Sequence, residues 1–271
     1  MCQEKTHIQV VVVRFQQEAE AEVILGLASE FELAGVEERA DSLVIWPAHR
    51  GEAAALARSL SRWRTELEEV EDRNWNEVYQ QTWTPLAAGE RFYLVPPGDT
   101  GTVPAGRLRL EMHAGMAFGN GDHPTTHLCL MAMEEGLHPG DRFLDVGCGS
   151  GLLAEAARLL GAGFASGCDL DAAVVRAGSF AGSTDAVRSG SCDYVVANIQ
   201  LGVLRALLPD IARILRPGGE GVLAGVTRDQ VTELRETVEA AGLVWRAGDA
   251  LGEWESVRIS RNDRGEPCAT L

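Results

Sequence analysis

The sequence predicts an α/β protein built on a doubly wound, mostly parallel sheet, preceded by a smaller α+β domain. From about residue 107 onward, apolar and β-branched segments alternate with helical ones, which is typical of a parallel sheet covered by helices. The first 70 residues instead follow the order strand, helix, strand, strand, helix, strand, which indicates a ferredoxin-like sandwich. The chain of 271 residues is long enough for two such domains.

The small domain, residues 1–70, begins with a β-branched strand and a helix that we expect Gly35 to end. Residues 71–105 are expected to be a linker, because proline and glycine punctuate much of this stretch. The expected strands are 7–15, 36–40, 42–47 and 66–72, and the expected helices are 18–34, 52–63 and a short one at 74–83.

The larger domain is expected at residues 106–263, followed by a tail at 264–271. One helix should stop at a Pro-Gly-Gly sequence that ends at residue 219. The expected strands are 107–112, 141–147, 164–170, 192–198, 221–226, 243–249 and 254–260, and the expected helices are 123–136, 151–162, 207–219 and 230–242.

Composition excludes several classes of protein. A formal net charge of −16 argues against direct binding of nucleic acid and suits either a basic partner or simple solubility. Lys5 is the single lysine, which excludes a phosphate-loop lysine and a Schiff-base lysine in the folded core. The six cysteines are scattered without metal-site spacing, and neither a secretory signal nor a membrane span is recognisable. We therefore expect a cytoplasmic protein with reduced thiols and no metal.

The strongest motif is Asp145-Val-Gly147-Cys-Gly149-Ser-Gly151, which lies between an expected strand and an expected helix. Alternate glycines allow a sharp turn and the close approach of a ligand, although structural turns produce similar runs. The spacing GxGxG differs from the GxGxxG of dinucleotide folds. A carboxylate at the strand end would repel a pyrophosphate and attract an ammonium group. Together these residues favour S-adenosylmethionine over NAD.

Two further strand ends carry polar residues. Asp169 ends the next strand, where it would accept hydrogen bonds from ribose hydroxyls. The alternative is capping of a following helix, for which Asp171 is better placed. Asn198 ends an apolar strand and is either a turn residue or an amide facing the methyl group, with its carbonyl accepting from an incoming amine.

The glycine-rich segment 115–126 precedes a helix and contains Phe118 in otherwise polar surroundings. Either Thr125 or Thr126 is suited to cap that helix, and His123 is suited to be a hydrogen-bond partner within the loop. With Phe118, the segment has the composition of a lid over the cofactor.

Four segments together resemble the PrmA-type methyltransferases, which modify protein eleven of the large ribosomal subunit. They are GMAFGNGDHPTTHLCL, FLDVGCGSGLLAEAARLLGA, GCDLD and DYVVANI, and the similarity runs from about Asn74 to Arg261. The resemblance implies a class I, Rossmann-like methyltransferase domain and a ferredoxin-like domain that recognises the substrate. It implies repeated N-methylation of lysine side chains and of an α-amino group in a basic ribosomal protein, with S-adenosylhomocysteine as the product. We expect a monomer.

The resemblance also assigns roles by motif. Thr126, Gly147, Asp169 and Asn198 would contact the cofactor, and Phe118 would lie against the cofactor or the target amine. The segment FAGSTDAV resembles the strand that lines the adenine pocket, which places Ser183 or Thr184 near the base. Our complete expected set has Asn198 and Phe118 as catalytic residues, and as cofactor-binding residues Thr126, Asp145, Gly147, Gly149, Gly151, Asp169, Ser183 and Asn198.

Three departures from the family pattern stand out. Met116 replaces a leucine, and Gln200-Leu201 replaces leucine-alanine after the VANI motif. The crossover at 172–179 has eight residues, about a dozen fewer than the family has, although a parallel crossover usually needs a full helix. We expect a stunted helix, a displaced strand or an impaired enzyme. The alternatives are a methyltransferase for another protein or a small amine, and a cofactor-binding module without catalysis; an NAD-linked oxidoreductase is disfavoured.

Overall fold

A computed structural model describes residues 7–16, 19–29, 31–39, 41–49, 51–71, 83–113 and 121–262. The chain divides into two compact units, Met1–Tyr79 and Gln80–Leu271. The expected short helix at 74–83 lies almost wholly outside the described residues.

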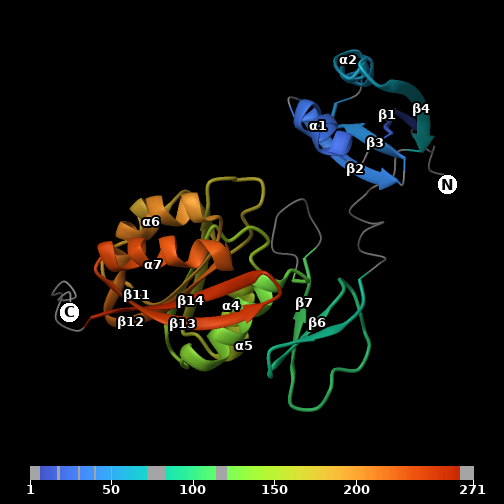
Figure 1. Ribbon diagram of the computed structural model, residues 1–271. Coiled ribbons are helices and arrows are strands. Elements are labelled where there is room, and N and C mark those ends of the chain that lie inside the picture. The colour runs from blue at the N-terminus through green and yellow to red at the C-terminus, as the bar shows by residue number, and fades with distance from the viewer. Residues whose placement is uncertain are drawn as a thin grey trace. The chain divides into compact units, whose positions relative to one another are not determined.

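The first unit is a four-stranded antiparallel sheet with two helices (Figure 1). Its strand order is β2-β3-β1-β4, as in a ferredoxin-like sandwich. Val11, Ile45 and Leu56 are among the residues of the core between the sheet and the helices. In chain order the elements are β1 (His7–Arg14), α1 (Ala19–Ala28), β2 (Leu33–Arg39), β3 (Ser42–Pro47), α2 (Ala53–Ser59) and β4 (Arg64–Glu71).

The expectation that Gly35 ends the first helix is wrong. Helix α1 ends at Ala28, and Gly35 lies within β2, opposite Trp46 of β3. The sequence after the helix, Phe-Glu-Leu-Ala-Gly-Val, carries enough apolar residues to continue a helical pattern. Pairing with β3 overrides that local preference, as tertiary contacts commonly do.

The second unit is built on a seven-stranded sheet of order β10-β9-β8-β11-β12-β14-β13 (Figure 1). The five strands from β10 to β12 are parallel, whereas β14 runs antiparallel to both of its neighbours. The strands are β8 (Arg142–Val146), β9 (Phe164–Asp169), β10 (Phe180–Ala181), β11 (Cys192–Asn198), β12 (Leu215–Thr227), β13 (Leu243–Leu251) and β14 (Trp254–Arg261). The order reverses between β8 and β11, so the loops after these two strands flank a crevice.

Helices cover both faces of this sheet. One face packs with α4 (Pro124–Gly136) and α5 (Leu152–Leu160), and the other packs with α6 (Leu201–Ile214) and α7 (Val231–Ala240). Side chains of β8 alternate between the two cores, with Phe143 on the first face and Leu144 on the second. No helix in the described ranges is both long and apolar enough to cross a membrane.

Helix α6 begins six residues earlier than the sequence predicts, and the Pro-Gly-Gly sequence is not its stop. The helix ends at Ile214, and Pro217 already lies within β12. The buried residues Leu204, Leu208 and Ile211 recur at helical spacing, so the apolar stripe extends through the earlier turn.

The expected linker carries structure in its second half. Strands β5 (Leu86–Ala88) and β6 (Phe92–Val95) join β7 (Leu108–Glu111) in a three-stranded sheet of order β5-β6-β7. Phe92 and Leu94 are fully buried and belong to the core formed with α4 and α5. These residues therefore form part of the second unit.

Asp193 joins three strands of the main sheet. Its carboxylate accepts hydrogen bonds from the backbone N–H of Arg142 at 2.9 Å, from Nε of Arg142 at 2.7 Å and from Arg216. The side-chain hydrogen bond from Arg142 is the main reason that the pKa of Asp193 is lowered well below its usual range.

We predict that Asp193→Asn lowers the free energy of unfolding by about 2 kcal/mol at pH 7, because charge-assisted hydrogen bonds are lost. A lowered native pKa stabilises the fold above the unfolded pKa of about 3.9, and this contribution disappears as pH falls further. Urea titrations at pH 7 and pH 3 should therefore show the difference shrinking at the lower pH. Glu239→Gln, which breaks the exposed pair with Arg235, is the control and should cost less than about 0.5 kcal/mol. An equal cost for both variants would contradict the prediction.

Candidate cofactor and catalytic site

An open pocket of about 820 Å³ lies at the carboxyl ends of the parallel strands, where the strand order reverses. It brings together five of the residues expected to bind a cofactor: Gly147, Gly149, Asp169, Ser183 and Asn198. These residues come from the last positions of β9 and β11 and from the loops after β8 and β10.

The loop after β8 makes a tight turn in which Gly147, Gly149 and Gly151 have φ angles of 72°, 45° and 79°. L-residues rarely adopt this left-handed region, which explains the alternate glycines. A Cβ at Gly147 would also lie 2.5 Å from Cγ2 of Ile199. Gly151 begins α5 as its N-cap and does not line the pocket.

The amide hydrogens of this loop are used within the protein. Gly147 and Cys148 both donate to the carbonyl of Cys168, at 2.9 and 3.1 Å, and Gly149 donates to Oδ2 of Asp169 at 2.9 Å. Gly151 donates to the carbonyl of Cys148. A phosphate-binding loop needs its N–H groups directed at the ligand, and these four are not available for that purpose.

The charges around the pocket also favour a cation. Asp169 and Asp171 belong to its wall, and none of the described residues that line it is a lysine or an arginine. A pyrophosphate would find no cation among these residues, and the four loop amides are already bonded, whereas a cationic nucleoside would find carboxylates. The residues present thus fit S-adenosylmethionine and do not fit a dinucleotide.

Asp169 accepts hydrogen bonds within the protein and also lines the open pocket. Besides the bond from Gly149, its Oδ1 accepts from the backbone N–H of Asp171 at 3.0 Å. The carboxylate of Asp171 in turn accepts from the N–H of Ala173 at 2.8 Å, although no helix follows for it to cap. Each oxygen of Asp169 accepts one backbone hydrogen bond, which leaves further acceptor capacity for ribose hydroxyls.

Asn198 is the last residue of β11 and is 8% exposed. It lines the open pocket and also a small cavity of about 20 Å³. Its Oδ1 is the buried end of the amide and has no hydrogen-bond partner among the described residues. The sequence expectation that this oxygen faces the methyl group therefore requires the amide to turn about χ2, a torsion with broad, two-fold preferences.

Asp145 and Thr126 line this small cavity and do not line the open pocket. Each is 1% exposed. Burial, followed by the nearby charge of Asp169, raises the pKa of Asp145 to about 7. Asp145 does not line the open pocket, and its expected contact with an ammonium group stays a prediction.

The N-cap of α4 is His123, so neither threonine caps this helix. The imidazole of His123 accepts from the backbone N–H of Thr125, and its Nδ1 lies 2.8 Å from Oγ1 of Thr125. Its ring also meets the edge of Trp254, with centroids 5.0 Å apart. His123, Thr125 and Trp254 all line the open pocket. The sequence does not single out Trp254, which lies at the start of β14, because an aromatic residue in a strand also suits a core.

The shortened crossover contains no helix. Residues 170–179 form turns, and β10 nevertheless takes its place beside β9 with only two paired residues, Phe180 and Ala181. Of the outcomes we considered, the helix is lost and the strand is not displaced. Leu170 and Val174 from this crossover, and Ser183 after it, still line the pocket. Thr184 is buried away from the pocket, 3.5 Å from Asp210.

Two side chains replace the missing strand pairing along β9. Oγ of Ser179 accepts from the N–H of Gly167 at 3.0 Å, and Nη2 of Arg158 donates to the carbonyl of Ala165 at 2.9 Å. The turns of the crossover are therefore attached to β9 through Ser179.

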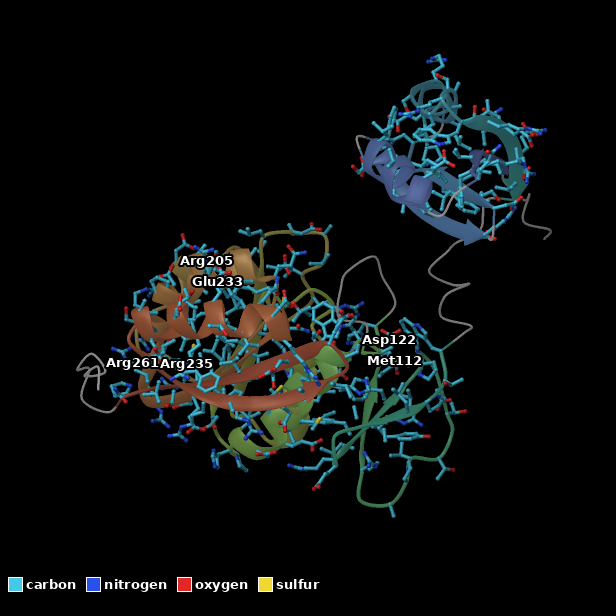
Figure 2. The ribbon with its side chains drawn as sticks, in the orientation of Figure 1. Met112, Asp122, Arg205, Glu233, Arg235 and Arg261 are labelled. Carbon is cyan, nitrogen blue, oxygen red and sulfur yellow. The ribbon has the colours of Figure 1, made fainter. Side chains whose placement is uncertain are left out.

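Phe118 lies outside the described residues, as does the rest of 114–120. The residues on either side of that segment are close together, since a Cβ at Gly121 would lie 3.1 Å from Cγ of Met112. Figure 2 shows Met112 and Asp122 side by side where β7 meets α4.

No three His, Cys, Asp or Glu side chains in the described ranges are arranged to hold a metal ion. The four described cysteines are buried and free. Burial is the main cause that raises the pKa of Cys148 to about 12 and of Cys168 to about 11, so both are thiols at neutral pH.

Comparisons with known proteins agree with this geometry. The family model described as "Ribosomal protein L11 methyltransferase (PrmA)" matches residues 17–262. Two curated proteins named ribosomal protein L11 methyltransferase are similar. The one from Ralstonia pickettii (strain 12J) is 37% identical over 195 residues, covering 68% of this chain and 65% of the relative. The one from Dechloromonas aromatica (strain RCB) is 38% identical over 199 residues, covering 69% and 66%.

The matched part therefore spans slightly less than two thirds of the length of these relatives. Among solved structures, a crystal structure of ribosomal protein L11 methylase from Lactobacillus delbrueckii subsp. bulgaricus has a TM-score of 0.60 at 23% identity. It covers 66% of this chain and 100% of that chain, and so shows a shared fold.

The raised pKa of Asp145 gives a prediction about stability. A native pKa above the unfolded value of about 3.9 stabilises the fold only at low pH, and this contribution is lost as pH rises through 7. Asp145→Asn cannot ionise, so its free energy of unfolding relative to wild type should rise by roughly 2–3 kcal/mol between pH 5 and pH 8. Denaturant titrations of the ligand-free protein measure this, with Glu239→Gln as control. Parallel pH profiles for Asp145→Asn and wild type would refute the assignment.

Proposed function

Since the chain belongs to the ribosomal protein L11 methyltransferase (PrmA) family, we propose that it is an S-adenosylmethionine-dependent methyltransferase of the cytoplasm. Its substrate would be ribosomal protein L11, N-methylated on lysine side chains, on the α-amino group, or on both. The observation that carries this proposal is the pocket itself, which has two carboxylates in its wall, no described cation, and a glycine loop with internally bonded amides.

The cofactor would be held by residues from three loops. Asp169 would accept from the ribose hydroxyls, the turn at Gly147 and Gly149 would admit close approach of the backbone, and Ser183 with Leu170 would lie at the base. Asp145 and Thr126, which do not line the open pocket, would act on the cofactor from the adjoining small cavity. When bound, the cofactor supplies a methyl group already activated by a positively charged sulfur, so the protein mainly has to align the reactants.

Asn198 is the residue we propose to orient the acceptor amine. Methyl transfer needs a neutral amine, whose lone pair forms the new N–C bond while the methyl–sulfur bond breaks and its electron pair remains on sulfur. A free lysine amine with a pKa near 10.4 is neutral in only about one molecule per thousand at pH 7.4. A neighbouring positive charge lowers that pKa, and the released proton passes to water. No other general base is needed.

The acidity of the chain supports a basic protein as partner. The formal net charge is −16, and in the first unit Glu66, Glu68 and Glu69 lie at least partly exposed on β4. Opposite charge speeds encounter and aligns partners more than it adds affinity. We therefore propose that residues 1–70 recognise the substrate, that 106–263 carry out the transfer, and that the enzyme works as a monomer without contacting nucleic acid directly.

The test is methylation of purified ribosomal proteins with radiolabelled S-adenosylmethionine, followed by mass spectrometry of the labelled band. Label in L11 alone is the expected result. Label in a different protein would overturn the substrate assignment. The helix missing from 170–179 favours a second candidate, a cofactor-binding module with impaired catalysis. Calorimetric binding of S-adenosylhomocysteine without any methyl transfer would support that candidate.

Two substitutions should separate binding from transfer. Asp169→Ala removes a charged acceptor and should weaken binding of S-adenosylhomocysteine tenfold or more, since hydrogen bonds to charged groups contribute about 1.5–3 kcal/mol. Asn198→Ala should lower kcat at least tenfold while the affinity for S-adenosylhomocysteine changes much less. Calorimetry and initial rates measure both, with the exposed Asp229→Asn as control. Unchanged affinity in Asp169→Ala would remove its assignment.

A further inference from the structure

The part of the pocket wall beside Asp169 belongs to a segment without regular secondary structure. Residues 170–179 form turns, and Leu170, Asp171 and Val174 of this segment line the open pocket. These three residues form the crossover wall of the pocket. Leu170 is 82% exposed, so its side chain has little contact with the protein and does not hold the segment in place. A helix is ordered by its own backbone bonds and by a packed apolar face, and turns without these need another source of order.

The outer edge of β9 supplies the first attachment points. Three alternate residues of β9 have a backbone group bonded on this edge. The bonds are Nη2 of Arg158 to the carbonyl of Ala165 at 2.9 Å, the N–H of Gly167 to Oγ of Ser179 at 3.0 Å, and the N–H of Gly182 to the carbonyl of Asp169 at 2.8 Å. The third is a backbone bond of the kind that pairs parallel strands, whereas side chains make the first two.

Two glycines allow these attachments to be close. A Cβ at Gly167 would clash with Cβ of Cys148 and would lie 3.1 Å from Oγ of Ser179, so the crossover and the glycine loop both pack on this residue. Gly178 has a φ of 91°, and a Cβ there would lie 2.9 Å from Nη2 of Arg158. The guanidinium of Arg158 therefore lies against both the crossover and the edge of β9, and its side chain joins them to α5.

A third side chain connects the middle of the crossover with the start of α5. A Cβ at Gly151 would lie 3.9 Å from Cδ of Arg176. Nη1 of Arg176 lies 3.4 Å from Nδ1 of His113, and Nε2 of His113 lies 2.9 Å from Oε2 of Glu155. One neutral tautomer of His113, with its proton on Nε2, donates to the carboxylate and accepts from the guanidinium. The crossover is thus attached on two sides, to β9 and to α5.

We propose that Arg158 and Ser179 are positioning residues of the cofactor site, which hold the crossover wall against the nucleoside in place of the missing helix. They act only through that wall, since neither of them lines the open pocket. Loss of either attachment frees the turns, and a ligand must then order them when it binds, which lowers its affinity. Methyl transfer from bound cofactor is not affected. The effect on binding rests on the proposed function, whereas the attachment of the crossover does not.

Calorimetry with S-adenosylhomocysteine and initial rates test the positioning role. Ser179→Ala removes the acceptor for Gly167, and Arg158→Met removes the donor to Ala165. Each should raise Kd about fivefold to tenfold. KM for S-adenosylmethionine should rise by a similar factor, with kcat at saturation within about twofold of wild type. Arg158→Lys keeps a donor and should restore most of the affinity.

The matched control is Ser191→Ala, which removes a hydroxyl that donates to the carbonyl of Arg188 in a different loop. It should leave Kd and kcat unchanged. Lower thermal stability with unchanged Kd in Ser179→Ala and Arg158→Met would show that these residues only stabilise the fold, and would refute positioning. A loss confined to kcat would refute it as well, because the crossover wall would then not act through cofactor binding.

Hydrogen exchange of the ligand-free chain decides the attachment even if the proposed function fails. The amides of Val174 and Gly182 each donate to a backbone carbonyl, and in Ser179→Ala they should exchange at least about tenfold faster than in wild type. Equal exchange in both proteins would overturn the proposal. If wild type binds no S-adenosylhomocysteine, the proposed function fails, and these exchange rates alone decide the attachment. If Ser179→Ala does not fold, Arg158→Met is measured in the same way.

Discussion

The site depends on how the glycine loop is attached to the neighbouring strand. The amides of Gly147 and Cys148 both donate to the carbonyl of Cys168 in β9, and the amide of Gly149 donates to the carboxylate of Asp169. The turn is thereby fixed by the strand it adjoins, and its N–H groups are turned away from the crevice. The same hydrogen bond fixes the carboxylate in the pocket wall. One set of contacts thus makes the loop rigid, places an acid beside the ligand, and removes the features that an anion would need.

The sequence alone predicts the main sheet and the position of the crevice, because apolar strands alternate with helices and the strands at the crevice end at or beside a glycine or a polar residue. It places Asp169 and Asn198 correctly in the pocket wall, since the carboxyl ends of parallel strands meet at one edge. The sequence does not predict how deeply each of these side chains is buried. Asp145 lies near the end of β8 much as Asp169 lies at the end of β9, yet Asp145 is buried beside a small cavity, and only the packing of α4 on the sheet reveals this.

The errors share a physical cause. The stretch after α1 and the residues of β5 and β6 are short and punctuated by glycine, and their conformation is decided by pairing with strands elsewhere in the chain. Trp254 was missed for a related reason. It reaches the pocket from β14, far along the chain from the motif residues, and its contact with His123 depends on the antiparallel placement of that strand.

The lost crossover helix has a consequence for the outer border of the sheet. Only two residues of β10 pair with β9, so Phe164 to Gly167 have no partner strand on that edge of the sheet, and Phe164 is 61% exposed. An unpaired edge of a sheet can pair with a strand of a second molecule, which leads to aggregation. Arg158 occupies the carbonyl of Ala165, and Ser179 occupies the amide of Gly167, so two of the groups that a foreign strand would use are already taken. In this chain, side chains therefore bind backbone groups at the edge of β9 that a longer β10 would otherwise pair with.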